Sequence, residues 1–209
     1  MVRVTKDAEE RKNELMDAAL ELFLKKGFDT TTITDIVKRV GVAQGLFYYY
    51  FGSKHDMLDA VIDRYIDNLI ESLANIASDN SLNITKKFQL FIDTFFRYGE
   101  NNELFAEDLH KDKNLIIHQK MTDKTIKLAT PLLLHIINEG IHKEVFSLSY
   151  PEETLEILVP GMMDYIHRYY FCQNKKTLSI KMRAAEDIIN RMLGTCSVKL
   201  NIFADTDMT

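Results

Sequence analysis

The sequence predicts an all-α protein with an N-terminal helix-turn-helix head of three helices joined to a C-terminal helical domain. Two observations predict the helical class. Apolar residues recur at helical spacing through most of the chain, and strand-like alternation of any length is missing. Only three prolines and eight glycines interrupt these patterns in 209 residues. The length suits one or two small domains, and a hydrophobic content of 46% is enough for a sizeable core.

One stretch near the N-terminus carries the sharpest local signals. Thr32 has the position of a helix N-cap, and Asp35 three residues later completes a capping-box pattern. An apolar face at helical spacing follows, and Gly41 supplies the positive φ that ends the helix and turns the chain. A second short helix is expected from about Gln44 to Tyr50. A third helix follows, with Ser53 as its cap and Asp56 three residues on.

The second of these helices has the chemistry of a DNA reader. Gln44 can pair with an adenine edge through two hydrogen bonds, which is worth roughly 1–3 kcal/mol of discrimination. Gly45 lets the helix approach the duplex closely, while tyrosine hydroxyls and Lys54 can bind phosphate oxygens. A helix this short can bury only about one face, so core packing alone does not explain three successive tyrosines. The expected DNA contacts are Thr32, Lys38, Ala43, Gln44, Gly45, Tyr48, Tyr49, Tyr50 and Lys54.

This segment resembles the DNA-binding domain of TetR-family transcriptional regulators. The resemblance covers about a quarter of the chain, and Leu46 and Gly52 depart from the usual pattern. It implies a head of residues 1–54 and a body of residues 55–209 that binds a small effector. It also implies a homodimer, whose two recognition helices read a palindromic double-stranded DNA operator. The matching positions are Thr32, Asp35, Ile36, Gly41, Val42, Gly45, Tyr48, Tyr49, Phe51, Ser53 and Lys54, with Leu15, Ala18, Ala19, Phe23, Gly27 and Phe28 before them.

Charge and composition set limits on this interpretation. The net charge is −5, but residues 1–54 hold nine Lys/Arg against eight Asp/Glu, so the head is mildly positive on an acidic body. This weak balance predicts modest non-specific affinity for DNA. The charged N-terminus has no apolar run typical of a signal peptide, and no stretch approaches the length of a membrane span. We therefore expect a cytoplasmic protein without a membrane partner.

The rest of the chain is expected to form a series of amphipathic helices. The first connects the head to the body, and Pro131 is expected to bend the longest of them because proline removes a backbone hydrogen bond. The last two carry enough apolar residues to cover both a core and a partner molecule. The expected helices are 58–73, one containing 88–96, a short one over 104–109, then 115–141, 152–172 and 178–193.

An effector pocket in the body is expected to combine apolar and histidine side chains. Methionine adapts to ligands of varied shape, and a histidine can donate a hydrogen bond. The effector would be lipophilic, aromatic or acyl in character. Ordinary core packing is the other interpretation of each apolar position. The candidate residues are Phe95, Phe105, His110, Met121, Met163 and His167.

Two other classes of protein are alternatives to a transcriptional regulator. Glu107 and His110, with Asp164 and His167, have the spacing of carboxylate–histidine pairs in di-iron helical bundles, but the second pair uses Asp. A helical adaptor that has lost DNA binding is a further alternative. The two cysteines lack metal-ligand spacing and are expected to be reduced thiols. The sequence thus favours a repressor that is not an enzyme and has no cofactor, no catalytic residues and no metal site.

Overall fold

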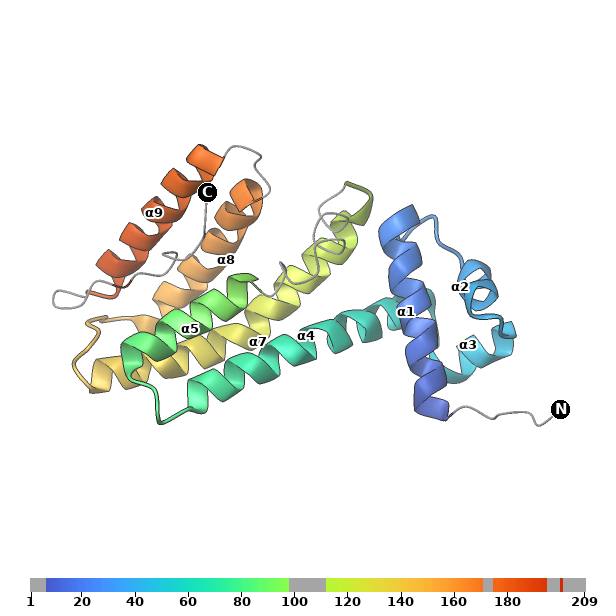
Figure 1. The fold of residues 1–209 in the computed structure, drawn as a ribbon, viewed down its shortest axis with the longest axis horizontal. Coiled ribbons are helices and arrows are strands. Elements are labelled where there is room, and N and C mark those ends of the chain that lie inside the picture. Colours follow the sequence, from blue (N-terminus) through green and yellow to red (C-terminus); the bar gives the residue numbers. More distant parts are fainter. Residues whose placement is uncertain (1–6, 98–111, 171–174, 195–199, 201–209) are drawn as a thin grey trace. The chain divides into compact units, whose positions relative to one another are not determined.

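The computed structural model describes residues 7–97, 112–170, 175–194 and 200, and the described chain is helical (Figure 1). This confirms the all-α class. The chain divides into two compact units. We call residues 1–68 with 102–121 the head unit, and residues 69–101 with 122–209 the body unit. The division falls within a helix rather than after residue 54, where we expected the head to end.

Three short-range signals build the helix-turn-helix as predicted. The Thr32 hydroxyl accepts from the Asp35 N–H at 3.1 Å, and the Asp35 carboxylate accepts from the Thr32 N–H at 3.1 Å. Gly41 ends that helix at φ 76°, a left-handed conformation that costs glycine no Cβ clash. The Ser53 hydroxyl accepts from the Asp56 N–H at 3.1 Å. The head helices are α1 (Ala8–Lys26), α2 (Ile33–Val40), α3 (Gln44–Tyr50) and the first part of α4 (Lys54–Ser78).

Later residues of the chain return to the head unit. They form a short 3-10 helix, η2 (Asp112–Asn114), and the first turns of α7 (Leu115–His142). The Asn114 side-chain amide donates to the carbonyl oxygen of Leu24 at 3.1 Å, and the Lys113 ammonium donates to that of Lys25. Both carbonyls belong to the last turn of α1, where backbone acceptors lack helical partners. Residues after the DNA-binding segment thus cap its first helix.

The body unit packs its helices around a core rich in phenylalanine. It comprises the end of α4, the rest of α7, and the helices α5 (Ile84–Arg97), α8 (Pro151–Tyr170) and α9 (Lys175–Met192). Phe88 and Phe91 of α5 are buried, and the Phe88 ring meets that of Phe146 edge to face at 5.7 Å. A Cβ on Gly140 would lie 2.2 Å from the Phe146 ring, so α7 needs glycine there. The buried core includes Leu69, Leu73, Ile84, Phe88, Phe91, Ile92, Leu133, Ile136, Ile137, Phe146, Leu155, Ile189 and Leu193.

Most expected body helices match observed ones within a few residues. α4 extends beyond the expected 58–73 at both ends, α8 begins one residue before the expected start, and Pro131 is inside α7. α9 begins at Lys175, three residues before the expected start. The short helix expected over 104–109 lies outside the described residues. Among the helices that the structure describes, none is long and apolar enough to cross a membrane.

Candidate DNA-binding surface and effector cavity

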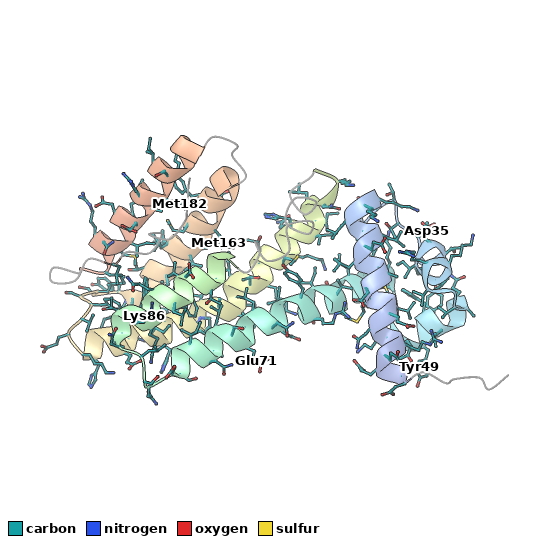
Figure 2. The ribbon with its side chains drawn as sticks, in the orientation of Figure 1. Asp35, Tyr49, Glu71, Lys86, Met163 and Met182 are labelled. Carbon is teal, nitrogen blue, oxygen red and sulfur yellow. The ribbon has the colours of Figure 1, made fainter. Side chains whose placement is uncertain are left out.

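The recognition helix α3 is fixed by one side and displays the other. Phe47 and Phe51 are buried, with ring centroids 5.7 Å apart, and anchor the helix to the head core. Tyr48 is 54% exposed and Tyr49 is 75% exposed. Figure 2 labels Tyr49 among the side chains of the head unit. Tyr50 is half-buried and packs edge to face on Tyr49 at 4.8 Å. The exposed side of α3 therefore carries polar aromatic tips.

The start of α3 is equally open. Ala43, Gln44 and Gly45 are all exposed, and a Cβ built on Gly45 would meet no atom within 4 Å. The side chain of Gln44 thus projects from the first turn of the helix, where recognition helices contact base edges. The structure brings these three predicted residues together with Tyr48 and Tyr49 on one short helix.

Two neighbouring cations at the end of α2 differ in their surroundings. Arg39 forms a two-pronged ion pair with Glu21 of α1, with N–O distances of 2.9 and 3.2 Å. Hydrogen bonds from Lys25 and then Arg39 lower the pKa of the Glu21 carboxyl. Lys38 is exposed and forms no ion pair within the described part of the chain. Lys38 is therefore the cation of this pair that is available to a phosphate.

Thr32 and Lys54, two further predicted contacts, have structural partners. The Thr32 hydroxyl uses its acceptor in the capping box but keeps its own O–H for a ligand. The Lys54 ammonium donates to the backbone carbonyls of Phe28 at 2.6 Å, Thr31 at 2.8 Å and Asp29 at 3.3 Å. These contacts use all three of its N–H donors. In this structure Lys54 therefore ties α4 to the loop after α1 and has no donor left for phosphate.

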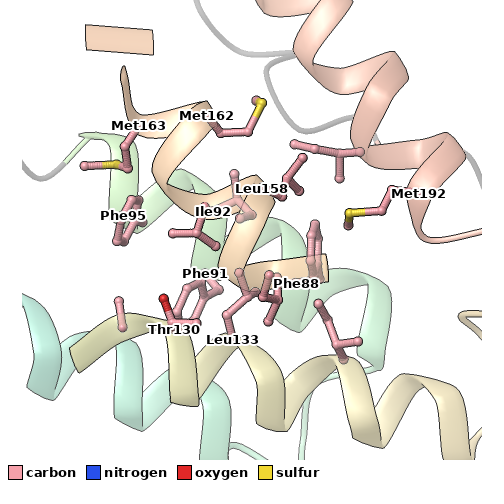
Figure 3. Close-up of a pocket in the computed structure, with 15 residues that line it drawn as sticks. Phe88, Phe91, Ile92, Phe95, Thr130, Leu133, Leu158, Met162, Met163 and Met192 are labelled. Atoms are coloured by element: carbon pink, nitrogen blue, oxygen red, sulfur yellow. The ribbon is translucent and has the colours of Figure 1, made fainter. Parts of the chain in front are cut away.

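The body unit contains an apolar cavity between α5, α7, α8 and α9 (Figure 3). The cavity volume is about 40 Å³. A drug-sized ligand needs roughly 300–1,000 Å³, so binding requires the walls to move apart. The lining residues are Phe88, Phe91, Ile92, Phe95, Ala129, Thr130, Leu133, Ile137, Leu155, Leu158, Val159, Met162, Met163, Ile189 and Met192.

The residues that we expected at an effector pocket are found in different places. Phe95 and Met163 line the cavity. Met121 is buried in the head unit and is not among the lining residues. Phe105 and His110 lie outside the described residues, as does the side chain of His167. The carboxylate–histidine pairs depend on these undescribed groups, and the described residues contain no cluster of three metal-ligating side chains.

Thr130 and the other lining residues of α7 are not among the residues that the sequence predicted at the pocket. The feature of the sequence that could have indicated Thr130 is its position as a threonine in an apolar segment, directly before Pro131. Helical periodicity does not distinguish a residue that lines a cavity from one that fills a core, because both are buried.

A helix-turn-helix head with an exposed recognition helix, followed by a helical body, defines the class of DNA-binding transcriptional regulators. Two family models match the chain. "Bacterial regulatory proteins, tetR family" matches residues 15–61, and "Tetracyclin repressor-like, C-terminal domain" matches residues 97–188. The chain belongs to the TetR family of transcriptional regulators. Members of this family are non-enzymatic DNA-binding regulators of transcription.

Curated relatives and solved structures agree with this assignment. The HTH-type transcriptional regulator YerO of Bacillus subtilis is 30% identical over 67% of this chain and 51% of its own length. The HTH-type transcriptional repressor KstR2 of Mycobacterium tuberculosis is 31% identical over 46% of this chain and 48% of its own. The matched segments thus span about half of each relative. The crystal structure of Bacillus subtilis FadR in complex with stearoyl-CoA is 19% identical, with a TM-score of 0.63 over 88% of this chain and 98% of that one, and is similar in fold.

Proposed function

We propose that this protein is a repressor that binds a palindromic operator as a homodimer and is released by a small lipophilic effector. The observation that carries the proposal is the apolar cavity of the body unit, which lies in the same chain as an exposed recognition helix. Gln44 would read a base in each half-site, and Lys38 with the α3 tyrosines would bind phosphates. Such a protein would act in the cytoplasm.

The outer surfaces of α8 and α9 support the homodimer. Ile157 of α8 is 79% exposed, and Ile180 and Ile188 of α9 are 60% and 50% exposed. α8 also displays Glu153 and Glu156, while α9 displays Arg183, which has no ion pair among the described residues. In a two-fold interface the same patch occurs on both copies, so the acidic α8 of one copy would face the basic α9 of the other. Covering large apolar side chains between such charges is what a homodimer interface provides.

Two helices offer a route from the effector to the DNA. Both α4 and α7 begin in the head unit and end in the body unit. Thr130, Leu133 and Ile137 of α7 line the cavity, while Asn114, just before this helix, binds the end of α1. An effector that widens the cavity would displace α7 and swing the connector helix α4, so that the heads no longer fit adjacent grooves. The coupling required is about 1–3 kcal/mol, a five- to 150-fold change in operator affinity.

The relatives agree with this class of effector without specifying it. KstR2 is named a transcriptional repressor, and the FadR structure contains stearoyl-CoA. The name of KstR2 supports a repressor, and the ligand of FadR supports an effector with an apolar chain. The proposal for this chain does not extend to a particular acyl group.

An operator-release assay with a cavity-filling variant tests the proposal. A panel of lipophilic, aromatic and acyl compounds is added to the protein on fluorescent operator DNA, and anisotropy is recorded. At least one compound should lower the operator affinity five- to 150-fold. Ala129→Val, which narrows the cavity by two methyl groups, should keep the operator affinity and weaken the response. Leu128→Val, at a neighbouring position outside the cavity lining, is the control. A response unchanged in Ala129→Val would place the effector elsewhere.

A further inference from the structure

The described residues that line the cavity of the body unit include a single polar side chain. Among these fifteen residues, Thr130 alone carries a hydroxyl, and the others are aliphatic, aromatic or methionine. No charged residue and no histidine is among the described residues that line it. The charged pair Lys87–Glu139 of the same unit lies outside the lining, and its ammonium and carboxylate bind each other at 2.7 Å.

The buried hydroxyl oxygen of Thr130 has no hydrogen-bond partner within the described part of the chain. Figure 3 shows this oxygen turned away from the α7 ribbon, toward the side of the cavity where Phe91 lies. Buried polar groups nearly always find a partner, because an unpaired one has lost its hydrogen bonds to water. A threonine kept unpaired at the wall of a cavity indicates a partner that arrives with a ligand.

We propose that the effector is an uncharged, mainly apolar molecule with one hydrogen-bonding oxygen or nitrogen, which Thr130 binds inside the cavity. This rests on the proposed function and names the chemistry of its effector. A carboxylate or phosphate within the cavity would lose its hydration without gaining a described cation, which is strongly unfavourable. The apolar part of a ligand, by contrast, would exchange contacts between apolar side chains for contacts of the same kind with the ligand.

The lining also accounts for how such a molecule enters. Met162, Met163 and Met192 have long flexible side chains that rearrange at low cost. The rings of Phe91 and Phe95 are nearly parallel, with centroids 6.4 Å apart, and present flat faces suited to an aromatic ligand. Movement of these side chains uncovers the Thr130 hydroxyl, which is sealed from solvent in this structure.

A matched pair of probes and a matched pair of side chains test this inference. 2-Naphthol and 2-methylnaphthalene differ by a hydroxyl in place of a methyl group, and both are neutral at pH 7. Thr130→Val makes the same exchange in the protein. The four dissociation constants are measured by probe fluorescence with the full chain. We expect Thr130→Val to weaken the binding of 2-naphthol roughly three- to tenfold. The affinity for 2-methylnaphthalene should stay the same or rise slightly.

Thr125→Val is the control, because Thr125 is a buried threonine of the same helix that is not among the lining residues. It should leave the affinity of both probes unchanged. Thr130→Val should also melt no lower than the wild type, since it removes an unpaired buried hydroxyl.

Each other outcome overturns the inference. Equal weakening of both probes would mean that Thr130 acts through packing, and no weakening of either would mean that its hydroxyl contacts no ligand. Failure of both probes to bind the wild-type protein would show that the cavity does not open to such molecules. The operator-release assay is independent of these measurements. If 2-naphthol binds through Thr130 but no compound releases DNA, the proposed function fails and the site remains.

Discussion

Lys54 is bound to Phe28 in two ways. Its ammonium donates to the Phe28 carbonyl oxygen at 2.6 Å and lies 4.4 Å from the centroid of the Phe28 ring. A charged hydrogen bond and a cation–π contact thus hold the start of α4 against the loop after α1. A residue expected to bind DNA phosphate instead fixes the geometry of the head.

Lys54→Met, which keeps the apolar part of the side chain, should therefore change the stability of the fold more than the salt dependence of DNA binding. We expect the free energy of unfolding to fall by about 2–3 kcal/mol, because charged hydrogen bonds contribute roughly 1.5–3 kcal/mol each. The dependence of operator affinity on salt should stay the same in the folded protein. Chemical denaturation and anisotropy titrations at several salt concentrations measure the two effects.

Lys38→Met is the matched comparison, because Lys38 is exposed and has no ion pair in the described chain. It should leave stability within about 0.5 kcal/mol and lower the salt slope by about one unit per subunit. The opposite pattern, with stability lost at Lys38 and slope lost at Lys54, would contradict these assignments.

Gly45→Ala separates the effect of this residue on helix stability from its effect on the close contact between α3 and DNA. Nothing lies within 4 Å of a Cβ at this position, so alanine should raise helix stability by about 0.5–1 kcal/mol. If Gly45 faces the duplex closely, operator affinity should fall although the melting temperature does not. Gly140→Ala is the contrasting control, since its Cβ would collide with the Phe146 ring and lower the melting temperature. Unchanged operator affinity in Gly45→Ala would place the DNA elsewhere.

Ile157→Glu should dissociate the homodimer. A charge at this highly exposed apolar position would add to the acids that α8 already displays, and it would have to be buried in the proposed interface. Sedimentation velocity should show a dimer for the wild type and mainly monomer for the variant. Leu115→Glu, at an exposed apolar position of the head unit, should remain dimeric. A dimeric Ile157→Glu variant would exclude this face of α8 from the interface.

The ion pair between buried Lys87 and half-buried Glu139 predicts a loss of stability in acid. Lys87 is 1% exposed, and hydrogen bonds from Lys143 and then Lys87 lower the pKa of the Glu139 carboxyl. Because the folded-state pKa lies below the unfolded one, this stabilisation is complete above the unfolded value of about 4.5 and disappears as the pH falls through the folded value.

Glu139→Gln should remove this acid-dependent contribution and lower stability at pH 7 by about 2 kcal/mol or more, because it leaves a buried ammonium without its counter-charge. Lys143→Met removes only an exposed partner and should cost about 1 kcal/mol or less. Urea denaturation between pH 3 and 7 provides the comparison. Parallel stability profiles for Glu139→Gln and the wild type would show that the pair does not contribute.

The sequence predicted the head best where its signals are local. The Thr32–Asp35 capping box, the turn at Gly41 and the bounds of α3 each depend on residues a few positions apart. The partners of Lys54 are carbonyls 23 to 26 residues away, and no local pattern specifies them. The cavity is harder still, since Met121 and Met163 look alike in sequence and only tertiary packing places one in the head unit and the other at the cavity.

Selection of binding sites from a random DNA pool, at near-physiological salt, tests the central claim most directly. The purified wild-type protein should enrich an inverted repeat with half-sites about one helical turn apart. Gln44→Ala should enrich the same repeat with relaxed preference at one position in each half-site. A folded dimer that enriches no sequence, or a Gln44→Ala variant with unchanged preference, would contradict operator reading by α3.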